Sequence, residues 1–468
     1  MNTDEFGAWS FIFYLIGLFA LISGLFPFWA TRFVARGKEG AVNTAVSANL
    51  IVAIVAAILY LPLVSVVLDA LGISSVALAI YLIAALQIVN TYIIAALEAC
   101  LRAIRPQVVG YGLLIEEGVK VSAAFAIFLG AGQLFFGAIA GIVLGASAQV
   151  VFYVWLLRDQ LRQPFHWEYL RQWVKGSFAM VYNVVGGQLF NLVFYLLVLF
   201  GGESALGDYQ AAVTFSAIIG YAASLAFALY PKMLAQECPE DIVVSFKNVL
   251  MFAVPIATVA LTMSQSLLTV LNASYSAAWP VLILLTIDAL VVLVLQFYTQ
   301  CLMGTETLDV EGKIVIRQLV RSKIFKVFSL TYVQAAIALP VVYFILAQTQ
   351  VGGPVNAAMY LTAINIMVHA ISFAAIYMLM RGEFKLMVAW KSIAKYLFAA
   401  LVSAALLLVI PQTTTLAVTF GKALVGLAVY GALLFVIDAD ARKLAKEMVE
   451  EIMGDSGEQF RFSKKAER

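Results

Sequence analysis

Long apolar runs, separated by gaps that alternate between basic and non-basic, constrain this chain more than any other feature. Runs of about 20 apolar residues have the length of a helix that crosses a bilayer. Thirteen such runs follow one another, at 8–30, 41–68, 74–97, 106–130, 132–157, 176–200, 205–230, 248–271, 277–303, 324–347, 355–380, 393–411 and 414–437. The pattern predicts an all-α polytopic membrane protein with about 13 transmembrane helices.

The charges indicate how these helices are oriented. The chain is 63% hydrophobic and only 12% charged. All but two of its 29 basic residues lie in every second gap, at the run ends next to these gaps or in the C-terminal tail, and the exceptions are Lys120 and Lys422. Lys and Arg near helix ends stay on the cytoplasmic side. We therefore expect a multi-pass protein of the cell membrane with its C-terminus in the cytoplasm and, for an odd number of spans, its N-terminus outside. Basic residues scattered over so many short segments do not indicate nucleic-acid binding.

An internal repeat suggests two similar lobes. EFGAWSFIFYL at 5–15 resembles LGDYQAAVTFS at 206–216, because both place a glycine two residues before an aromatic residue at the expected outer end of a helix. Cys100 and Cys301 each end a span, and their separation in the sequence is nearly the same as that of the two motifs. Parallel repeats of this kind are a known transporter architecture. The second lobe has a span before its repeat motif and the first has none, so the first lobe is expected to lack one helix.

The segment between the lobes predicts a helix lying on the membrane surface. Leu161, Phe165, Tyr169 and Trp173 recur at every fourth position among basic residues, and Trp167 and Trp173 would act as interfacial anchors. The predicted organisation is an N-terminal lobe at 1–157, an amphipathic interfacial linker at 158–175, a C-terminal lobe at 176–380, two extra spans at 381–437 and a cytoplasmic tail at 438–468.

Several segments resemble the polysaccharide and lipid-linked oligosaccharide flippases of the multidrug/oligosaccharidyl-lipid/polysaccharide exporter superfamily. The similar segments are DEFGAW at 4–9, FPFWATRFVARGKEG at 26–40, GESALGDYQAA at 202–212 and SYSAAWPVLILL at 274–285. The resemblance implies two six-helix lobes around a central cavity, followed by two further helices. It implies a transporter rather than an enzyme, with no cofactor. Its partners would be a polyprenyl-phosphate- or pyrophosphate-linked glycan, membrane lipids and glycosyltransferases of the same pathway.

Four basic residues are candidates for binding the anionic phosphate of such a cargo, because a charge inside a membrane helix is costly and usually functional. They are Arg32, Arg36, Lys120 and Lys422. Arg32 and Arg36 share one helix face, and the resemblance favours Arg32 most. For this pair, anchoring at the cytoplasmic surface by snorkelling explains the charges equally well.

Three carboxylates are candidates for ion coupling. Glu116 and Glu117 lie in the fourth run and Asp288 in the ninth. Glu116 and Lys120 are four residues apart and are expected to pair, which leaves Glu117 for a cation or a proton; a self-neutralised group between helices is the alternative. Lys422 and Asp288 are either partners across the bundle, or each of them faces water.

The leading function is a transporter that flips a lipid-linked oligosaccharide or polysaccharide precursor to the outer leaflet by alternating access. The alternative within the same superfamily is a cation-coupled small-molecule exporter, which the intramembrane carboxylates keep open. A membrane-embedded glycosyltransferase or polymerase is less favoured, because the outer loops are short and lack acidic metal-binding motifs. The three cysteines have no histidines at metal-ligand spacing, so no metal is expected.

Overall fold

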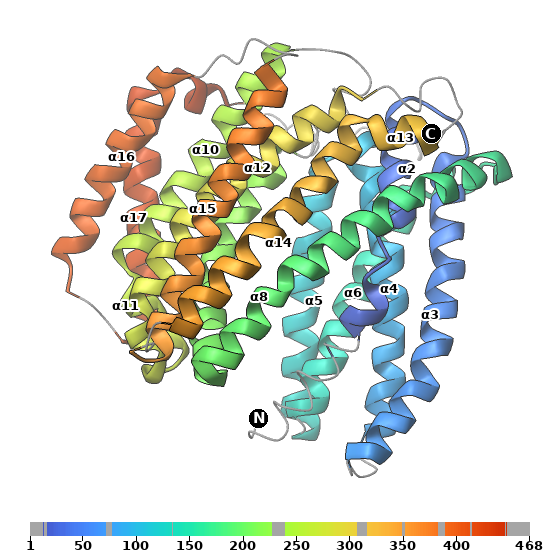
Figure 1. Cartoon of the computed structure of the whole chain (residues 1–468), viewed down its shortest axis with the longest axis horizontal. Helices are drawn as coiled ribbons and strands as arrows, with labels where there is room; N and C mark the ends of the chain where they lie inside the picture. Colours follow the sequence, from blue (N-terminus) through green and yellow to red (C-terminus); the bar gives the residue numbers. More distant parts are fainter. Residues whose placement is uncertain are drawn as a thin grey trace, which may run out of the picture. The chain divides into compact units, whose positions relative to one another are not determined.

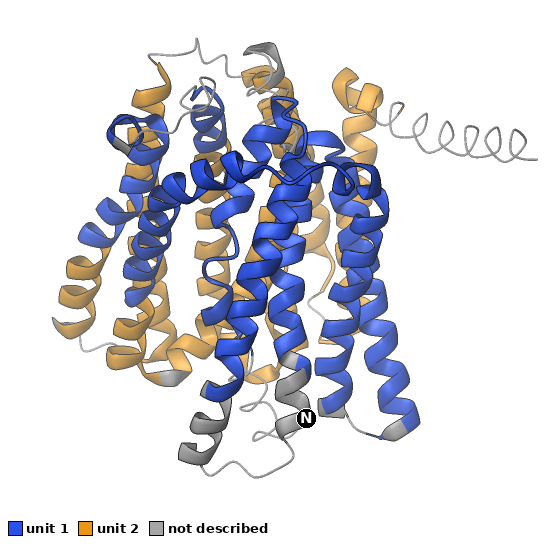
Figure 2. Ribbon diagram, turned by 90° about the vertical axis from the view of Figure 1, so that its right-hand side faces the viewer, with its two compact units in different colours: residues 1–192, 227–238, 298–337 blue, residues 193–226, 239–297, 338–468 orange. Residues whose placement is uncertain are grey.

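The chain is helical in a computed structural model, shown in Figure 1. The structure describes residues 13, 16–71, 77–132, 134–226, 239–306, 316–348, 352–381, 389–411, 414–444 and 446. No β-strand occurs within these ranges. The described residues form two compact units, coloured separately in Figure 2, and the boundaries between the units fall inside three helices, α8, α12 and α14.

The first unit comprises Met1–Leu192, Phe227–Cys238 and Tyr298–Ile337. Its helices are α2 (Leu25–Ala35), α3 (Ala41–Leu71), α4 (Ala77–Ile104), α5 (Gln107–Ala131), α6 (Leu134–Leu156), α7 (Arg158–Leu161), the first part of α8 (Trp167–Gly220), the end of α12 (Trp279–Gly304), α13 (Ile316–Arg321) and the first part of α14 (Lys323–Gln348). Tyr60, Ile88 and Tyr92 are fully buried at its core.

The second unit comprises Val193–Ala226, Pro239–Phe297 and Ala338–Arg468. Besides the remaining parts of α8, α12 and α14 it contains the 3₁₀ helix η1 (Tyr221–Ala226), α10 (Pro239–Thr262), α11 (Ser264–Leu271), η2 (Ala273–Ala278), α15 (Pro354–Arg381), α16 (Trp390–Val409) and α17 (Leu416–Ile437). α8 changes direction at Gly202, whose φ of 78° is outside the helical region.

Ten helices of the described part are long and apolar enough to cross a membrane. The expectation of an all-α polytopic membrane protein is confirmed, but three of the thirteen predicted spans, 8–30, 106–130 and 205–230, are not among the ten. α5 covers 106–130 as a helix, but it carries three charged side chains, Glu116, Glu117 and Lys120. The run at 205–230 ends in residues outside the described part.

The prediction of one continuous helix over 8–30 is wrong in its described part. Residues 16–20 are helical, 21–24 form a turn, and α2 begins at Leu25. The turn leaves carbonyl groups without helical partners, which is costly in a bilayer. The Tyr92 hydroxyl donates to the Phe19 carbonyl at 2.8 Å, and the Asn49 amide donates to the Ser23 carbonyl at 3.0 Å. Neighbouring helices therefore stabilise the break.

The linker at 158–175 is not one helix. α7 ends at Leu161, and α8 begins at Trp167, beyond Pro164, and runs without interruption into the predicted span at 176–200. Trp167 is 67% exposed, as an interfacial anchor would be, but Trp173 is fully buried and packs on Phe33 of α2 at 5.5 Å between ring centroids. Trp173 is therefore a core residue, and the interfacial location of the segment stays a prediction.

A row of glycines brings α6 against α5. Gly137, Gly141 and Gly145 repeat at every fourth position and so lie on one face of α6. A Cβ atom on Gly141 would lie 2.7 Å from the Lys120 carbonyl oxygen, and one on Gly145 would lie 2.6 Å from the Glu116 carbonyl oxygen. Small residues of this kind let membrane helices approach closely. The contact fixes the α5 backbone at its charged residues.

We expect Gly141→Leu to destabilise the protein by about 1–3 kcal/mol, because the side chain would force the two backbones apart. The measurement is the midpoint of thermal unfolding of the detergent-purified protein. Gly118→Leu on α5 is the matched control, since a Cβ atom there meets no atom within 4 Å. Equal midpoints for the two variants would contradict the close packing of α5 on α6.

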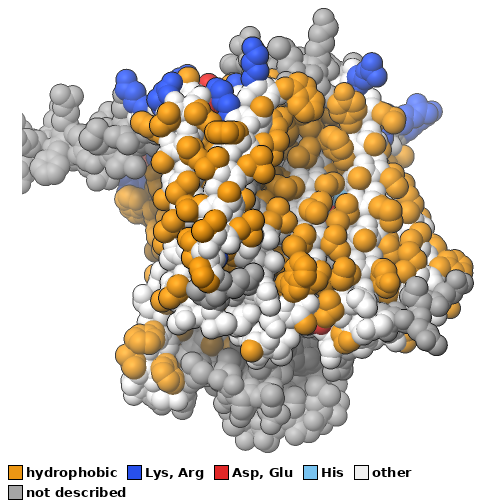
Figure 3. All heavy atoms as spheres, turned by 90° about the vertical axis from the view of Figure 1, so that its left-hand side faces the viewer, with side chains coloured by type: hydrophobic (Ala, Val, Ile, Leu, Met, Phe, Trp, Pro, Cys, Tyr) orange, Lys and Arg blue, Asp and Glu red, His pale blue; other side chains and the backbone are white. Residues whose placement is uncertain are grey.

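In the second unit, α16 and α17 pack together and against α10. The Ser403 hydroxyl donates to the Gly426 carbonyl at 2.8 Å, and the Tyr430 hydroxyl donates to the Met251 carbonyl at 3.1 Å. The two helices predicted as extra C-terminal spans thus join α10 through hydrogen bonds as well as apolar contacts. Figure 3 shows this side of the molecule, where apolar side chains cover the face and Lys and Arg side chains lie toward one end.

Two ion pairs in the second unit join α10 and α16 to the segment that follows α17. Lys247 of α10 pairs with Asp440 at 2.9 Å, and Lys395 of α16 pairs with Asp438 at 2.8 Å. The hydrogen bond from the Lys247 ammonium holds the pKa of Asp440 below its usual value. Three segments expected on one side of the membrane therefore meet, although which side that is stays a prediction.

Candidate functional site

The second unit contains a buried acid–imidazole pair inside its membrane helices. Asp288 lies in the middle of α12 and His369 in the middle of α15. The His369 Nδ1 atom is 2.7 Å from the Asp288 Oδ1 atom, and the two side chains are only 14% and 10% exposed. With a neutral imidazole the pair carries one net negative charge, and one added proton makes it neutral. A buried pair of this kind inside membrane helices is a candidate site for a monovalent cation.

Two further polar side chains complete this Asp288–His369 site. Asn365 lies one helical turn before His369, and the hydroxyl of Tyr209 on α8 lies near both Asn365 and Asp288. The Asn365 Oδ1 atom is buried and has no hydrogen-bond partner in the described part of the chain. Polar side chains from three helices thus come together in a buried region. The described residues contain no group of three or more His, Cys, Asp or Glu that could hold a metal ion.

Lys422 is not the partner of Asp288. It is 6% exposed, and its Nζ atom donates to the carbonyl of Ile410 at 2.7 Å and, more weakly, to that of Pro411 at 3.5 Å. These carbonyls follow the last turn of α16, where unpaired backbone acceptors and the helix dipole favour a cation. The hypothesis of a pair across the bundle is therefore wrong, because each group has a nearer partner.

Arg32 and Arg36 meet backbone acceptors as well. Arg32 is fully buried, and its guanidinium donates to the carbonyls of Met303 and Glu306 at 3.1 and 2.6 Å. Arg36 donates to the same Glu306 carbonyl at 3.2 Å. Both arginines thus converge on the C-terminal end of α12, as Lys422 does on the end of α16. The sequence could not show this, because the contacts join residues about 270 positions apart.

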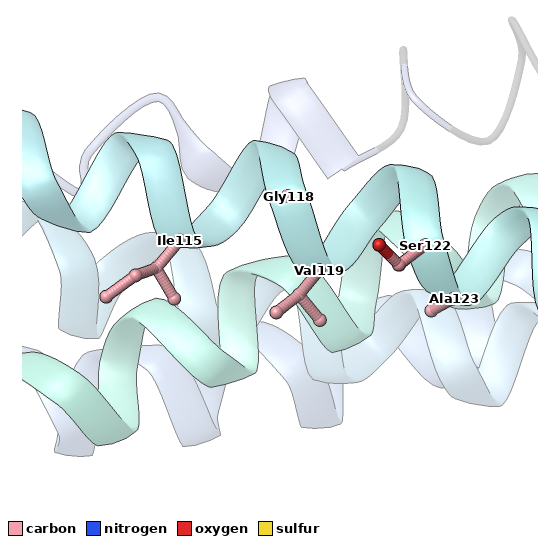
Figure 4. A pocket seen from close by; sticks show the side chains of 5 residues that line it. All are labelled: Ile115, Gly118, Val119, Ser122 and Ala123. Carbon is pink, nitrogen blue, oxygen red and sulfur yellow. The ribbon is translucent and has the colours of Figure 1, made fainter.

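The charges on α5 are paired differently from the prediction. Lys120 forms its ion pair with Glu117, three residues earlier, rather than with Glu116. Glu116 makes no hydrogen bond or ion pair within the described residues. Beside these charges α5 bears a shallow hollow lined by small and apolar residues, drawn in Figure 4: Ile115, Gly118, Val119, Ser122 and Ala123. Among its lining residues the hollow offers one hydroxyl, that of Ser122, and no charge, which is too little to hold a glycan.

Sequence reasoning missed a second polar network, in the first unit. Glu98 accepts hydrogen bonds from Arg102 at 3.1 Å, from Gln149 at 3.2 Å and from the Tyr153 hydroxyl at 3.4 Å. Tyr153 is also within 3.0 Å of the Val109 carbonyl of α5. Glu98 and Arg102 lie one helical turn apart on α4, and the signal that could have indicated the wider network is the Gln-x₃-Tyr spacing on one face of α6.

Comparison with known proteins yields structural likeness only. No protein-family model and no curated protein matches the sequence. Eighteen chains of solved structures match the fold. A multidrug resistance MATE family transporter of the MOP superfamily, in an outward-facing conformation, is 14% identical with a TM-score of 0.60, over 82% of this chain and 89% of the other. A MATE protein in the straight conformation is 15% identical with a TM-score of 0.59, over 80% and 86%.

A third similar structure is a MOP superfamily transporter from Pyrococcus furiosus, described as having a binding pocket of reverse polarity. It is 15% identical with a TM-score of 0.52, over 80% of this chain and 86% of the other. These likenesses do not single out the polysaccharide flippases within the superfamily. At these identities they establish the fold, and the chain is an all-α polytopic membrane protein with a fold similar to that of MATE transporters of the MOP superfamily.

Proposed function

We propose that this chain is a secondary transporter that works by alternating access and couples its cargo to a cation, most simply a proton, at the Asp288–His369 site. The observation that carries the proposal is the buried pair itself, with 2.7 Å between its two atoms. Ionisable groups inside membrane helices are costly and mark ion pathways and proton relays. The fold similar to MATE transporters supports the same conclusion.

The physical reason for coupling is the change of charge. A bound proton would neutralise the pair, and the helices that hold it, α12 and α15 with α8 beside them, would then lose a charge from a buried environment. A conformation that exposes the pair to water favours the charged form, and one that buries it favours the neutral form. Proton uptake therefore biases the equilibrium between the two conformations.

For the cargo we propose a lipid-linked oligosaccharide or polysaccharide precursor, moved from the cytoplasmic to the outer leaflet. The resemblance of four sequence segments to the flippases supports this class. Two lobes, 1–157 and 176–380, would enclose the path, with thirteen spans in all. Arg32, Arg36, Lys120 and Lys422 stay predictions as phosphate contacts, as do Glu116 and Glu117 for ion coupling. Each of the four basic groups has a protein partner here, which it would have to leave.

A cation-coupled small-molecule exporter is the second candidate. It is favoured by the buried carboxylate of Asp288 and by the multidrug transporter among the similar structures. It needs no basic groups in the cavity.

Reconstituted vesicles distinguish the two cargoes. The protein is placed in vesicles that contain a pH-sensitive dye, and a polyprenyl-pyrophosphate oligosaccharide is added to one leaflet, with a lipophilic organic cation as the comparison. We expect the oligosaccharide to become inaccessible to an impermeant periodate reagent together with a proton flux. Proton flux with the organic cation alone would instead support the exporter. Absence of proton-coupled movement of either compound would refute coupled transport of these cargoes.

A further inference from the structure

Two arginines of α2 converge on the C-terminal end of α12. Arg32 donates to the Met303 and Glu306 carbonyls, and Arg36 donates to the Glu306 carbonyl, at distances between 2.6 and 3.2 Å. The guanidinium of Arg32 is completely buried by this contact and its surroundings. Carbonyls at a helix C-terminus carry partial negative charge, so charged donors bind them more strongly than neutral ones do.

The end of α12 is also tied to the start of α14. The Glu306 carboxylate accepts the backbone N–H of Lys323 at 2.7 Å, the position from which a carboxylate caps a helix N-terminus. The Lys323 ammonium returns a bond to the Thr305 hydroxyl at 3.0 Å. The end of α12 and the start of α14 are therefore joined to each other, and α2 contacts both.

α2 has contacts on both sides of this junction. The Thr31 hydroxyl is 3.0 Å from the Ala99 carbonyl of α4, within the predicted first lobe. Toward the predicted second lobe, Trp29 is fully buried against Gly176 of α8, where a Cβ atom would lie 2.4 Å from the indole. Phe28 meets Phe328 of α14 edge-on, at 6.0 Å between centroids. The end of α2 thus lies between elements of the two predicted lobes.

We propose that Arg32 is the latch of a cytoplasmic gate: its bonds to the end of α12 hold the two lobes together at this end, and they break when the transporter opens to the cytoplasm. The proposal rests on alternating access in the proposed function. The basic residues that follow α2 and α12 in the sequence indicate that these helix ends lie on the cytoplasmic side. Both partners can be hydrated on separation, because the carbonyls lie at the end of α12 and Arg32 lies in the last turn of α2, so the bonds are reversible.

Two native thiols can report on the latch. Cys100 follows Ala99 on α4, and Cys301 lies two residues before Met303 on α12, so the thiols belong to different predicted lobes. Both are free and fully buried. The full-length protein, with Cys238→Ser to remove the third thiol, is labelled in inside-out vesicles with a membrane-impermeant maleimide.

We expect slow labelling of Cys301 and Cys100 in the parent protein. In Arg32→Gln both thiols should label about tenfold faster, because the loss of a hydrogen bond to a charged group shifts a two-state equilibrium by about that factor. Arg32→Lys retains one donor and should label at an intermediate rate. Arg321→Gln, which removes an exposed arginine at the end of α13, should label at the parent rate.

A third thiol separates opening of the gate from loss of structure. Ala399→Cys places it at a fully buried site of α16, in the second unit. If this thiol reacts faster in parallel with the native ones, Arg32 merely stabilises the fold and the latch is rejected. Unchanged labelling of Cys301 in folded Arg32→Gln also rejects it, and labelling only from right-side-out vesicles rejects a cytoplasmic gate. Because labelling requires no cargo, faster labelling without any transport would refute the proposed function and leave the latch standing.

Discussion

Asp288→Asn should abolish cation-driven transport while the protein remains folded. The amide has nearly the shape of the carboxylate and still reaches His369, but it cannot change charge. A group that moves a conformational equilibrium fully from one side to the other supplies about 5.5 kcal/mol of differential binding, so its loss should lower transport by roughly a hundredfold or more. The measurement is the initial rate of proton flux driven by a cargo gradient in reconstituted vesicles.

The carboxylates of α5 are the matched controls for this prediction. Glu117→Gln makes the same chemical change in another intramembrane helix, but the Glu117 side chain is 60% exposed and paired with Lys120. Glu116→Gln tests a carboxylate without a hydrogen-bonded partner among the described residues. If the Asp288–His369 site alone carries the coupling, both variants keep most of the proton flux. If either abolishes flux and Asp288→Asn does not, then α5 carries the coupling and the Asp288–His369 site is structural.

Most of the later spans could be predicted from the sequence because their apolar composition alone determines where they begin and end. The run at 324–347 appears as α14 over Lys323–Gln348, and the run at 355–380 as α15 over Pro354–Arg381. An apolar stretch of this length is helical in a bilayer since no water is available to its backbone. The limits of each helix therefore follow closely from its own composition.

Helix ends that depend on tertiary contacts were predicted less well. The run at 74–97 stops before Glu98, but α4 continues to Ile104, because Glu98 and Arg102 form a network with α6 that keeps the extra turns in place. The run at 8–30 appears continuous in hydropathy, yet it breaks before Gly24 where Asn49 satisfies the freed backbone. Hydropathy records the cost of exposure to water and not the presence of a partner from another helix.

The partners of buried charges could not be predicted for the same reason. Asp288 and His369 are separated by 81 positions, and nothing in either helix's periodicity indicates which faces meet. Lys422 and Arg32 are both candidate phosphate ligands by their position in the sequence, and both are buried. That their acceptors are helix C-terminal carbonyls follows only from the packing, because every helix of the chain ends in such carbonyls.

Lys395→Met should be among the most destabilising single changes in the second unit. It removes the partner of Asp438, which is only 1% exposed and whose second oxygen has no hydrogen bond in the described part of the chain. Removing one member of a buried pair costs about 3–5 kcal/mol. We expect a value at the low end, because the Lys395 side chain is 39% exposed and water already reaches it. The measurement is the thermal unfolding midpoint in detergent.

The neighbouring ion pair provides the decisive comparison. Lys247→Met removes the partner of Asp440, whose side chain is 50% exposed, so the stranded carboxylate stays hydrated and the cost should be about 0–1 kcal/mol. Adding Asp438→Asn to Lys395→Met removes the buried charge and should restore most of the lost stability. Equal losses from the two lysine variants, or no recovery in the double variant, would show that the destabilisation comes from lost lysine packing. Recovery would show that the burial of Asp438 makes Lys395 necessary for holding the end of α17 against α16.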